Sequence, residues 1–297
     1  MKAHQLEPKL KALRLGGMVE SLEIRLGEAE KGELGYLTFL EMLLEDEIAR
    51  RAQKALSRRL ARARFEEVKT LADFDFTYNP KIPAATIRDL ATGRFIARKE
   101  SVLIYGPVGT GKSHIAQAIG HAACRRGHEV LYAKIPRLFA DLGGGHADGT
   151  WESRLRQYLK PDLLILDDFG LRELGIRQAE DLYELICQRY QRSSTMVVSN
   201  RAPQDWYPLF PNPVLAEGAL DRLVNSSHHL LMVGKSYRPM RRPDRGSYPS
   251  PRTGPSGDQS GQDQPLQRVP DASGSIGQTG SDEFPPNTVY REVTDMA

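Results

Sequence analysis

The stretch Gly106-Pro-Val-Gly-Thr-Gly-Lys112-Ser113 decides the fold of this chain, because it fits the nucleotide-binding pattern G-x-x-x-x-G-K-[ST]. The apolar run at 101–105 that precedes it predicts a buried parallel strand, and the apolar residues of 112–125 recur at helical spacing. A strand, a glycine-rich turn and a helix in this order predict a phosphate-binding loop. Without that context, the same letters would indicate only a glycine-rich turn.

Each residue type in this loop has a chemical reason to be there. Gly106, Gly109 and Gly111 permit backbone angles and a close approach to phosphate that a Cβ would block. We expect the ammonium group of Lys112 to reach the β- and γ-phosphates of a nucleotide, and the hydroxyl group of Ser113 to ligate Mg²⁺. The expected nucleotide-contacting residues are Gly106, Pro107, Val108, Gly109, Thr110, Gly111, Lys112, Ser113 and His114.

Length and composition restrict the class of protein. A chain of 297 residues with 40% hydrophobic content can form one large domain and a smaller one. The net charge is only +3, so a nucleic-acid partner must be argued from local clusters of charge. Cys124 and Cys187 are the only cysteines, and we expect both to be reduced core residues. The absence of a long apolar segment or signal peptide predicts a cytoplasmic protein with no membrane partner.

Residues 1–70 are predicted to form a small helical domain. We expect breaks between helices at Gly16-Gly17 and around 31–35, and a capping box at 38–41 that starts a long third helix. One broad side of this helix is basic and could bind DNA phosphates, although it could also be a solvated charged face. The basic side comprises Arg50, Arg51, Lys54, Arg58, Arg59 and Arg62, and the opposite, apolar side comprises Ala52, Leu56, Leu60 and Ala63.

Residues 71–238 alternate apolar runs with helical stretches, which predicts an α/β domain built on a five-stranded, mostly parallel sheet. The expected strands are 101–105, 129–133, 162–167, 195–199 and 228–232. The expected helices are 84–92, 112–125, 135–142, 151–159, 177–191 and 214–224. Residues 239–297 are rich in Pro, Gly and Ser and lack apolar periodicity, which predicts a disordered tail without an assigned function.

Polar residues follow two of the predicted strands, at the edge where open α/β sheets bind ligands. We expect Asp167 to hold Mg²⁺ and Asp168 to orient an attacking water, although two acids after an apolar run can also be a strand entering a turn. Asn200 could hydrogen-bond the γ-phosphate or the water, or form an ordinary turn. Arg222, near the end of a predicted helix, is either a surface residue or an arginine finger for a neighbouring subunit's nucleotide.

Several aromatic and basic residues allow two interpretations. Phe74 and Phe76 could lie near the adenine, but packing over the sheet is favoured, and Trp206 is expected to be a hydrophobic anchor. Tyr237 and Arg238 could contact phosphate or a neighbouring subunit, and the sequence does not decide between these. No metal-ligand partner occurs at useful spacing from the histidines at 114, 121, 228 and 229.

The segments GPVGTGKSHIA, LLILDDFG, TMVVSNRAPQDW, ALDRL and GKSYR together resemble the IstB-like ATP-binding proteins. These are AAA+ helper ATPases of a class of bacterial insertion sequences, and they are similar in sequence to DnaC helicase loaders. The resemblance covers roughly residues 8–238. It implies an AAA+ core, ATP with Mg²⁺, self-assembly into rings or filaments, binding of duplex DNA and stimulation of a partner transposase.

The resemblance also implies roles for individual residues. Lys112 matches the phosphate ligand of the family and Ser113 its Mg²⁺ ligand, and Asp167 matches the metal carboxylate. Asn200 matches the sensor I residue, and Arg222 matches the arginine finger. Asp168 departs from the family pattern, since AAA+ proteins usually have Glu there. Its side chain is one methylene shorter, which bears on the rate of hydrolysis more than on nucleotide binding. No helical lid with a second sensor arginine is expected after Arg238, as is typical of loaders of this type.

Three functions follow from these interpretations. The first is a DNA-dependent ATPase that assembles on target DNA through ATP-bridged subunits, delivers the DNA to a transposase and is released by hydrolysis. The second is a helicase loader, whose N-terminal domain would bind a replicative helicase. The third is an ATP-gated scaffold with little turnover, which is suggested by the side chain of Asp168, shorter than the usual Glu.

Overall fold

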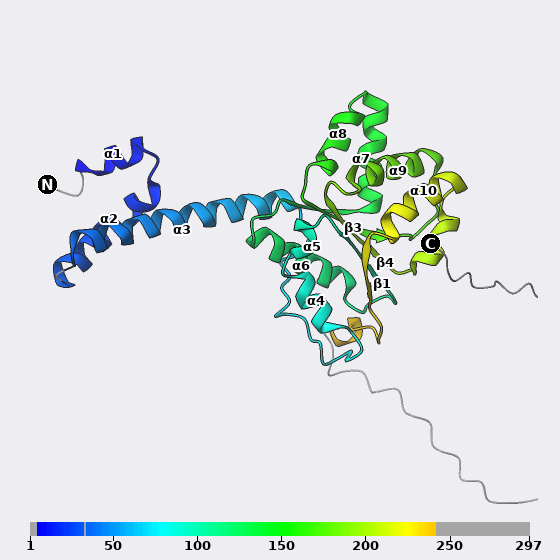
Figure 1. Cartoon of the computed structure of the whole chain (residues 1–297), viewed down its shortest axis with the longest axis horizontal. Coiled ribbons are helices and arrows are strands. Elements are labelled where there is room, and N and C mark those ends of the chain that lie inside the picture. The colour runs from blue at the N-terminus through cyan, green and yellow to red at the C-terminus, as the bar shows by residue number, and fades with distance from the viewer. Residues whose placement is uncertain (1–4, 33, 242–297) are drawn as a thin grey trace, which may run out of the picture. The chain divides into compact units, whose positions relative to one another are not determined.

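A five-stranded parallel sheet forms the centre of the computed structural model, in the order β2-β3-β4-β1-β5 (Figure 1). The structure describes residues 5–32 and 34–241, so the tail expected at 239–297 lies outside it from residue 242 onward. The strands are β1 (Ser101–Tyr105), β2 (Val130–Lys134), β3 (Leu163–Phe169), β4 (Ser194–Ser199) and β5 (Ser227–Leu231). All five expected strands are confirmed: β1 has the expected bounds, and the ends of the other four shift by at most two residues.

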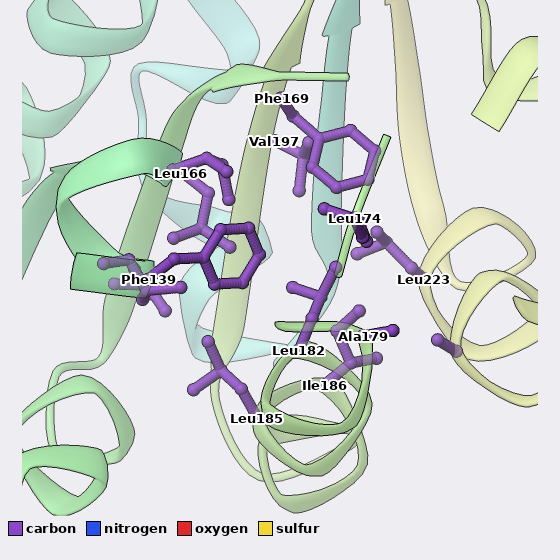
Figure 2. Close-up of a cluster of buried hydrophobic side chains, with 14 of the residues drawn as sticks. Phe139, Leu166, Phe169, Leu174, Ala179, Leu182, Leu185, Ile186, Val197 and Leu223 are labelled. Atoms are coloured by element: carbon purple, nitrogen blue, oxygen red, sulfur yellow. The ribbon is translucent and has the colours of Figure 1, made fainter. Parts of the chain in front are cut away.

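The sheet is covered on both faces, as its continuous apolar strands require. Successive side chains of β3 alternate between the two faces, so Leu164 and Leu166 belong to one core cluster and Leu163 and Ile165 to the other. Figure 2 shows Leu166 in the first cluster, together with residues of the helices that cover that face. These helices are α7 (Ile135–Asp148), α8 (Trp151–Leu159), α9 (Ile176–Arg189) and α10 (Pro213–Val224).

The opposite face of the sheet is covered by α4 (Ala84–Leu90), α5 (Arg94–Ala97) and α6 (Lys112–Arg125). The six helices expected in this domain are confirmed, but the short α5 was not expected. Two 3₁₀ segments complete the domain, η2 (Pro203–Leu209) and η3 (Arg238–Arg241). The second of these overlaps the beginning of the predicted tail.

The helix α7 continues through three consecutive glycines, past its expected end at 142. The glycines favour a helix end by propensity, but packing against α8 overrides it. A Cβ on Gly145 would lie 2.8 Å from the Cα of Trp151. The absence of a side chain at Gly145 therefore permits the close contact between these two helices.

Three helices precede the sheet: α1 (Glu7–Ala12), α2 (Gly16–Gly32) and α3 (Tyr36–Ala63). Gly16 and Gly17 begin α2 and do not interrupt a helix, so the break lies just before them. Gly17 donates its N–H to Glu47 of α3 at 2.5 Å, and a Cβ on Gly17 would lie 2.6 Å from the Cα of Glu47. This glycine therefore lets the two helices approach closely.

The expected capping box at 38–41 is wrong. Gly35 is the N-cap of α3, with an extended backbone at ψ 148° and no side-chain capping bond, so Thr38 lies within the first turns of the helix. Glycine is tolerated at an N-cap because its backbone adopts the required conformation readily. The chain therefore enters the helix three residues earlier than the Thr38 pattern predicts.

The second half of α3 packs against the sheet domain through Leu56, Leu60 and Ala63. Ala52, expected on the same apolar side, is exposed. Arg59 is also part of this contact, because its Nε donates a hydrogen bond of 2.9 Å to the carbonyl of Cys124 in α6. Part of the predicted basic side is therefore turned toward the protein itself.

Three more of the six basic residues take part in ion pairs: Arg50 with Glu20, Arg51 with Glu47, and Arg62 with Glu129. For Lys54 and Arg58, the described part of the chain contains no ion-pair partner, and both side chains are exposed. These two residues are therefore the most available cations of the predicted basic side.

Both cysteines are free thiols, and Cys124 is buried as expected, whereas Cys187 is only half-buried. The expectation that both are core residues is therefore wrong for Cys187.

None of the described helices combines the length and the apolar character that a bilayer span requires.

Candidate nucleotide-binding site

A cavity of about 310 Å³ lies at the carboxyl ends of β1, β3 and β4, next to the predicted phosphate loop. This volume is at the lower end of the range typical of small-molecule sites. The cavity is lined by most of the predicted site residues: Val108, Gly109, Thr110, Gly111, Lys112, Ser113, His114, Asp167, Asp168 and Asn200. Gly106 and Pro107 belong to the same loop but do not line the cavity.

The three glycines of the loop have positive φ angles, at 138° for Gly106, 83° for Gly109 and 95° for Gly111. A Cβ on Gly106 would lie 2.3 Å from the backbone oxygen of Met232, and one on Gly111 would lie 2.5 Å from the Phe74 ring. Glycine is therefore required both for the backbone conformation and for space.

The side chain of Lys112 is folded into the loop that it follows. Its ammonium group donates hydrogen bonds of 2.8 Å to the carbonyl of Gly106 and 2.7 Å to that of Pro107. Burial lowers the pKa of Lys112 to about 8, and the negative charge of Asp167 opposes this effect. A phosphate group would give the buried ammonium a charged partner, so the loop is suited to an anionic ligand.

The carboxylate of Asp167 is almost completely buried and is held at both oxygens. Tyr132 donates its phenolic hydrogen bond to Oδ2 at 2.7 Å, and the backbone N–H of Asp168 donates to Oδ1 at 2.8 Å. Tyr132 belongs to β2, which pairs with β3 in the sheet. The orientation of this carboxylate is therefore fixed by the adjacent strand.

Asp168 is half-buried and has a positive φ of 60°, at an irregularity in the pairing of β3 with β4. Burial raises the pKa of the Asp168 carboxyl, and the charge of Asp167 raises it further. Lys134, at the end of β2, has its ammonium 3.9 Å from Oδ2 of Asp168 and 3.0 Å from the carboxylate of Glu66. Asp168 therefore lines the cavity and lies near a cation that does not line it.

The end of β4 places Asn200 at the cavity. The hydroxyl of Ser199 donates to the carbonyl of Phe169 at 2.8 Å and accepts the N–H of Arg201 at 3.0 Å. These bonds fix the turn on both sides of Asn200, whose side chain is exposed and lines the cavity.

Arg222 lies elsewhere, on α10, and does not line the cavity. Its guanidinium donates a hydrogen bond of 2.6 Å to the carbonyl of Gly218, one turn earlier in the same helix. The structure therefore brings four of the five predicted catalytic residues together and leaves Arg222 apart from them.

Three residues near the two carboxylates were not predicted from the sequence: Tyr132, Lys134 and Glu66. None of them belongs to the phosphate loop or to the two acids. Tyr132 and Lys134 lie near Asp167 and Asp168 because β2 pairs with β3, and Glu66 is ion-paired with Lys134. Glu66 follows the end of α3, where the N–H groups of Glu66 and Glu67 both donate to Gln117 of α6. No pattern of the sequence indicates this contact.

The aromatic residues considered in the sequence have different surroundings in the structure. Phe74 lines the cavity, whereas Phe76 does not and lies under the guanidinium of Arg88 at 5.5 Å. Trp206 is fully buried with its ring 4.7 Å from that of Phe169, which confirms the hydrophobic anchor.

Within 5–32 and 34–241, no group of three or more His, Cys, Asp or Glu side chains could hold a metal ion. Mg²⁺ does not need such a group, because proteins usually bind it through one or two carboxylates together with substrate phosphates and water. The immobilised Asp167 and the hydroxyl of Ser113, which line the same cavity, are a suitable pair of residues for that arrangement.

Residues 8–244 match the family described as IstB-like ATP binding protein. The chain belongs to this family. It is 54% identical over 241 residues to a protein of Mycobacterium tuberculosis named as an ATP-binding protein in an insertion sequence, and the match covers 81% of this chain and 96% of that protein. It is 38% identical over 235 residues to a protein of Pseudomonas aeruginosa named as an ATP-binding protein of insertion sequence IS21, covering 79% and 89%. Among solved structures, DnaI is similar at 20% identity and a TM-score of 0.49, covering 56% of this chain and 91% of that one.

This IstB-like chain therefore has the family and the fold that its motifs predict. The phosphate loop follows the strand β1 of an all-parallel five-stranded sheet, and the two carboxylates lie near the carboxyl end of β3. The predicted five-stranded parallel core with its phosphate loop is confirmed, and the family to which the chain belongs is described as ATP binding.

Proposed function

We propose that this chain is an ATP-dependent transposition helper that oligomerises on target duplex DNA and directs or stimulates a partner transposase. Hydrolysis of ATP then releases the assembly. The names of its relatives support the connection with insertion sequences, and the cavity beside the phosphate loop supports the use of ATP. The partners of this function are duplex DNA, a transposase and other copies of the chain.

The observation that best supports the proposal is that the predicted catalytic residues lie in two separate places. Lys112, Asp167 and Asp168 line one cavity, whereas Arg222 lies on α10 outside it. An arginine that neutralises charge during phosphoryl transfer can be supplied by a second subunit. Arg222 of a neighbouring copy would complete the site, so the bound nucleotide would join the two copies.

The residues of the cavity suit hydrolysis of the terminal phosphate. Water attacks the terminal phosphorus, the bond from phosphorus to the bridging oxygen of ADP breaks, and the proton of the water passes to the Asp168 carboxylate. Lys112 and Asn200 would bind and orient the phosphate. Mg²⁺, when bound at Asp167 and Ser113, supplies neutralisation of the phosphate charge.

DNA binding is assigned to the basic side of α3. The proposal rests on Lys54 and Arg58, the two exposed cations of this side of α3 that have no ion-pair partner in the described part of the chain. Contacts to phosphates do not depend on base sequence, which suits a protein that binds many target sites.

The experiment that tests this function is the ATPase rate with and without duplex DNA, for the wild type and for Lys112→Ala. We expect DNA to stimulate the wild type and the variant to lose the stimulated rate. Lys160→Ala removes an equivalent charge from an exposed position outside the cavity and should keep it. A wild type whose rate is unchanged by DNA would contradict the DNA-dependent ATPase.

One observation favours a second function, an ATP-gated scaffold with little turnover. Asp168 has a short side chain for this position, and the ammonium of Lys134 lies 3.9 Å from it. If ATP binding and assembly occur without turnover in the wild type, Asp168→Glu tests the cause, because it extends the carboxylate by one methylene. A rise in hydrolysis in that variant would identify the reach of the carboxylate as limiting.

A further inference from the structure

The segment 235–238 crosses the phosphate loop and is fixed to it. Tyr237 donates its backbone N–H to the carbonyl of Gly109 at 2.9 Å. A Cβ on Gly109 would lie 2.1 Å from the hydroxyl oxygen of Ser236, so the segment lies directly against the loop. The position of Arg238, the next residue, is therefore tied to that of the phosphate loop.

Two residues that precede the sheet, Tyr78 and Asn79, also hold this segment. Asn79 is buried and makes two hydrogen bonds of 3.0 Å with the backbone of Lys235, one through its amide nitrogen and one through its oxygen. Tyr78 donates its hydroxyl to the carbonyl of Ser236 at 3.0 Å, and its ring packs edge-on to that of Tyr237 at 4.9 Å. The backbone that leads to Arg238 is thus held both by the side chains of Tyr78 and Asn79 and by the phosphate loop.

The charges around the cavity leave the Arg238 guanidinium available. Lys69 lines the cavity in an ion pair with Glu67, and Lys112 donates to two loop carbonyls. Arg238 lines the cavity with an exposed side chain and has no ion pair with any residue that the structure describes. Its positive charge acts on both Lys112 and Asp168, which lie at the phosphate-binding end. A triphosphate carries more negative charge than the loop lysine alone can neutralise.

We propose that Arg238 is a phosphate ligand of the ATP site, supplied by the same chain that supplies the phosphate loop, and that it contacts the terminal phosphate. A guanidinium binds phosphate oxygens through paired, charge-assisted hydrogen bonds, which an ammonium does not reproduce. The terminal phosphate is assigned because Arg238 is near both Lys112 and Asp168, the group expected to face the attacking water. This inference rests on the proposed function, since it concerns the same site.

The test is to measure the affinity of the full chain for a fluorescent, non-hydrolysable ATP analogue and for fluorescent ADP at equilibrium. Arg238→Ala should weaken binding of the ATP analogue by at least about tenfold, with a smaller loss for ADP. Arg238→Lys should recover only part of the affinity. Arg98→Ala removes the same charge from an exposed position outside the cavity and should bind both nucleotides as the wild type does.

The outcomes separate this inference from the proposed function. A wild type that binds the analogue while Arg238→Ala binds it within about twofold would overturn the role of Arg238 and leave the ATP site intact. Equal losses for the analogue and for ADP would overturn the assignment to the terminal phosphate. A wild type that binds neither nucleotide would overturn the proposed function and this inference with it. Thermal unfolding of each variant shows whether it is folded.

Discussion

The phenolic hydroxyl of Tyr132 donates a hydrogen bond of 2.7 Å to Oδ2 of Asp167, so one strand of the sheet orients the carboxylate of the next. The bond is buried, and the second oxygen of Asp167 accepts the N–H of Asp168. Groups that orient a metal-binding carboxylate affect metal affinity even though they do not touch the metal. Tyr132 is therefore a positioning residue for the proposed Mg²⁺ site.

Tyr132→Phe removes this hydrogen bond and keeps the ring. We expect the ATPase to need about tenfold more Mg²⁺ for half-maximal rate, because the carboxylate is no longer held in one orientation. Titration of the rate with Mg²⁺ measures this. Tyr158→Phe is a matched control, since Tyr158 is also buried and donates to a carboxylate, that of Asp141 at 2.9 Å, outside the cavity. Equal Mg²⁺ requirements in both variants would show that Tyr132 has no special role.

The contrast between Asp167 and Tyr132 shows how much of the site is predictable from sequence. Asp167 and Asp168 follow a run of four apolar residues and lie near the carboxyl end of β3. Carboxyl ends of parallel strands form ligand sites, so the local pattern is sufficient to predict them. Tyr132 reaches Asp167 only because β2 lies beside β3. That adjacency results from packing of the whole domain, and no periodicity of a single segment encodes it.

The same distinction applies to the fold. The strands β1 to β4 were predictable because buried parallel strands are continuous apolar runs, whereas the edge strand β5 is largely exposed. The continuation of α7 through its glycines was not predictable from the sequence. The close approach of α8 at Gly145 outweighs the low helix propensity of glycine. Glu66 reaches the cavity because the chain after α3 follows α6 through Gln117, which is again a tertiary contact.

Gly106→Ala should destabilise the protein. The residue has a φ of 138°, and the new methyl group would lie 2.3 Å from the backbone oxygen of Met232, whose N–H is already bonded to Tyr105. We expect a loss of about 2 kcal/mol or more in the free energy of unfolding, measured with denaturant. Gly143→Ala is the control: a Cβ there meets nothing within 4 Å inside α7, so it should raise stability by up to about 1 kcal/mol. Similar losses in both variants would contradict the steric argument.

Reversal of the two free cations of α3 tests the DNA surface. The double variant Lys54→Glu, Arg58→Glu should weaken binding to duplex DNA and reduce the slope of log affinity against log salt by about 2. The control Arg98→Glu, Arg192→Glu changes the net charge equally at exposed positions outside α3. Unchanged affinity and slope in the first variant would exclude this face as the DNA surface.

Arg59→Glu should behave differently from the double variant. Its guanidinium donates to the carbonyl of Cys124, so reversal places a carboxylate beside a carbonyl oxygen at the contact between α3 and α6. We expect the unfolding temperature to fall together with any loss of DNA binding. Wild-type thermal stability would show that the contact contributes little.

The ion pair between Arg25 of α2 and Asp46 of α3 should make these helices sensitive to acid. The hydrogen bonds from Arg25 lower the pKa of Asp46 to about 2, below its ordinary 3.8. A carboxyl with a lowered pKa stabilises the fold fully above its ordinary pKa, and this contribution is lost as the pH falls toward 2. Arg25→Met should therefore speed amide exchange in α2 and α3 at neutral pH and have little effect near pH 2. An equal effect at both pH values would assign the contribution of Arg25 to packing.

A mixing experiment tests whether Arg222 acts on a neighbouring subunit. Arg222→Ala keeps the residues of its own cavity, and Lys112→Ala keeps its arginine, so each variant alone should have little DNA-stimulated ATPase activity. In an equimolar mixture, about a quarter of the contacts between subunits join an intact cavity to an intact arginine, because heterologous interfaces pair different surfaces of the two copies. We therefore expect about a quarter of the wild-type rate to return. The double variant Arg222→Ala, Lys112→Ala mixed with Lys112→Ala contains no intact cavity and should stay inactive. Without recovery in the first mixture, Arg222 would act within its own chain or have a structural role through its bond to Gly218.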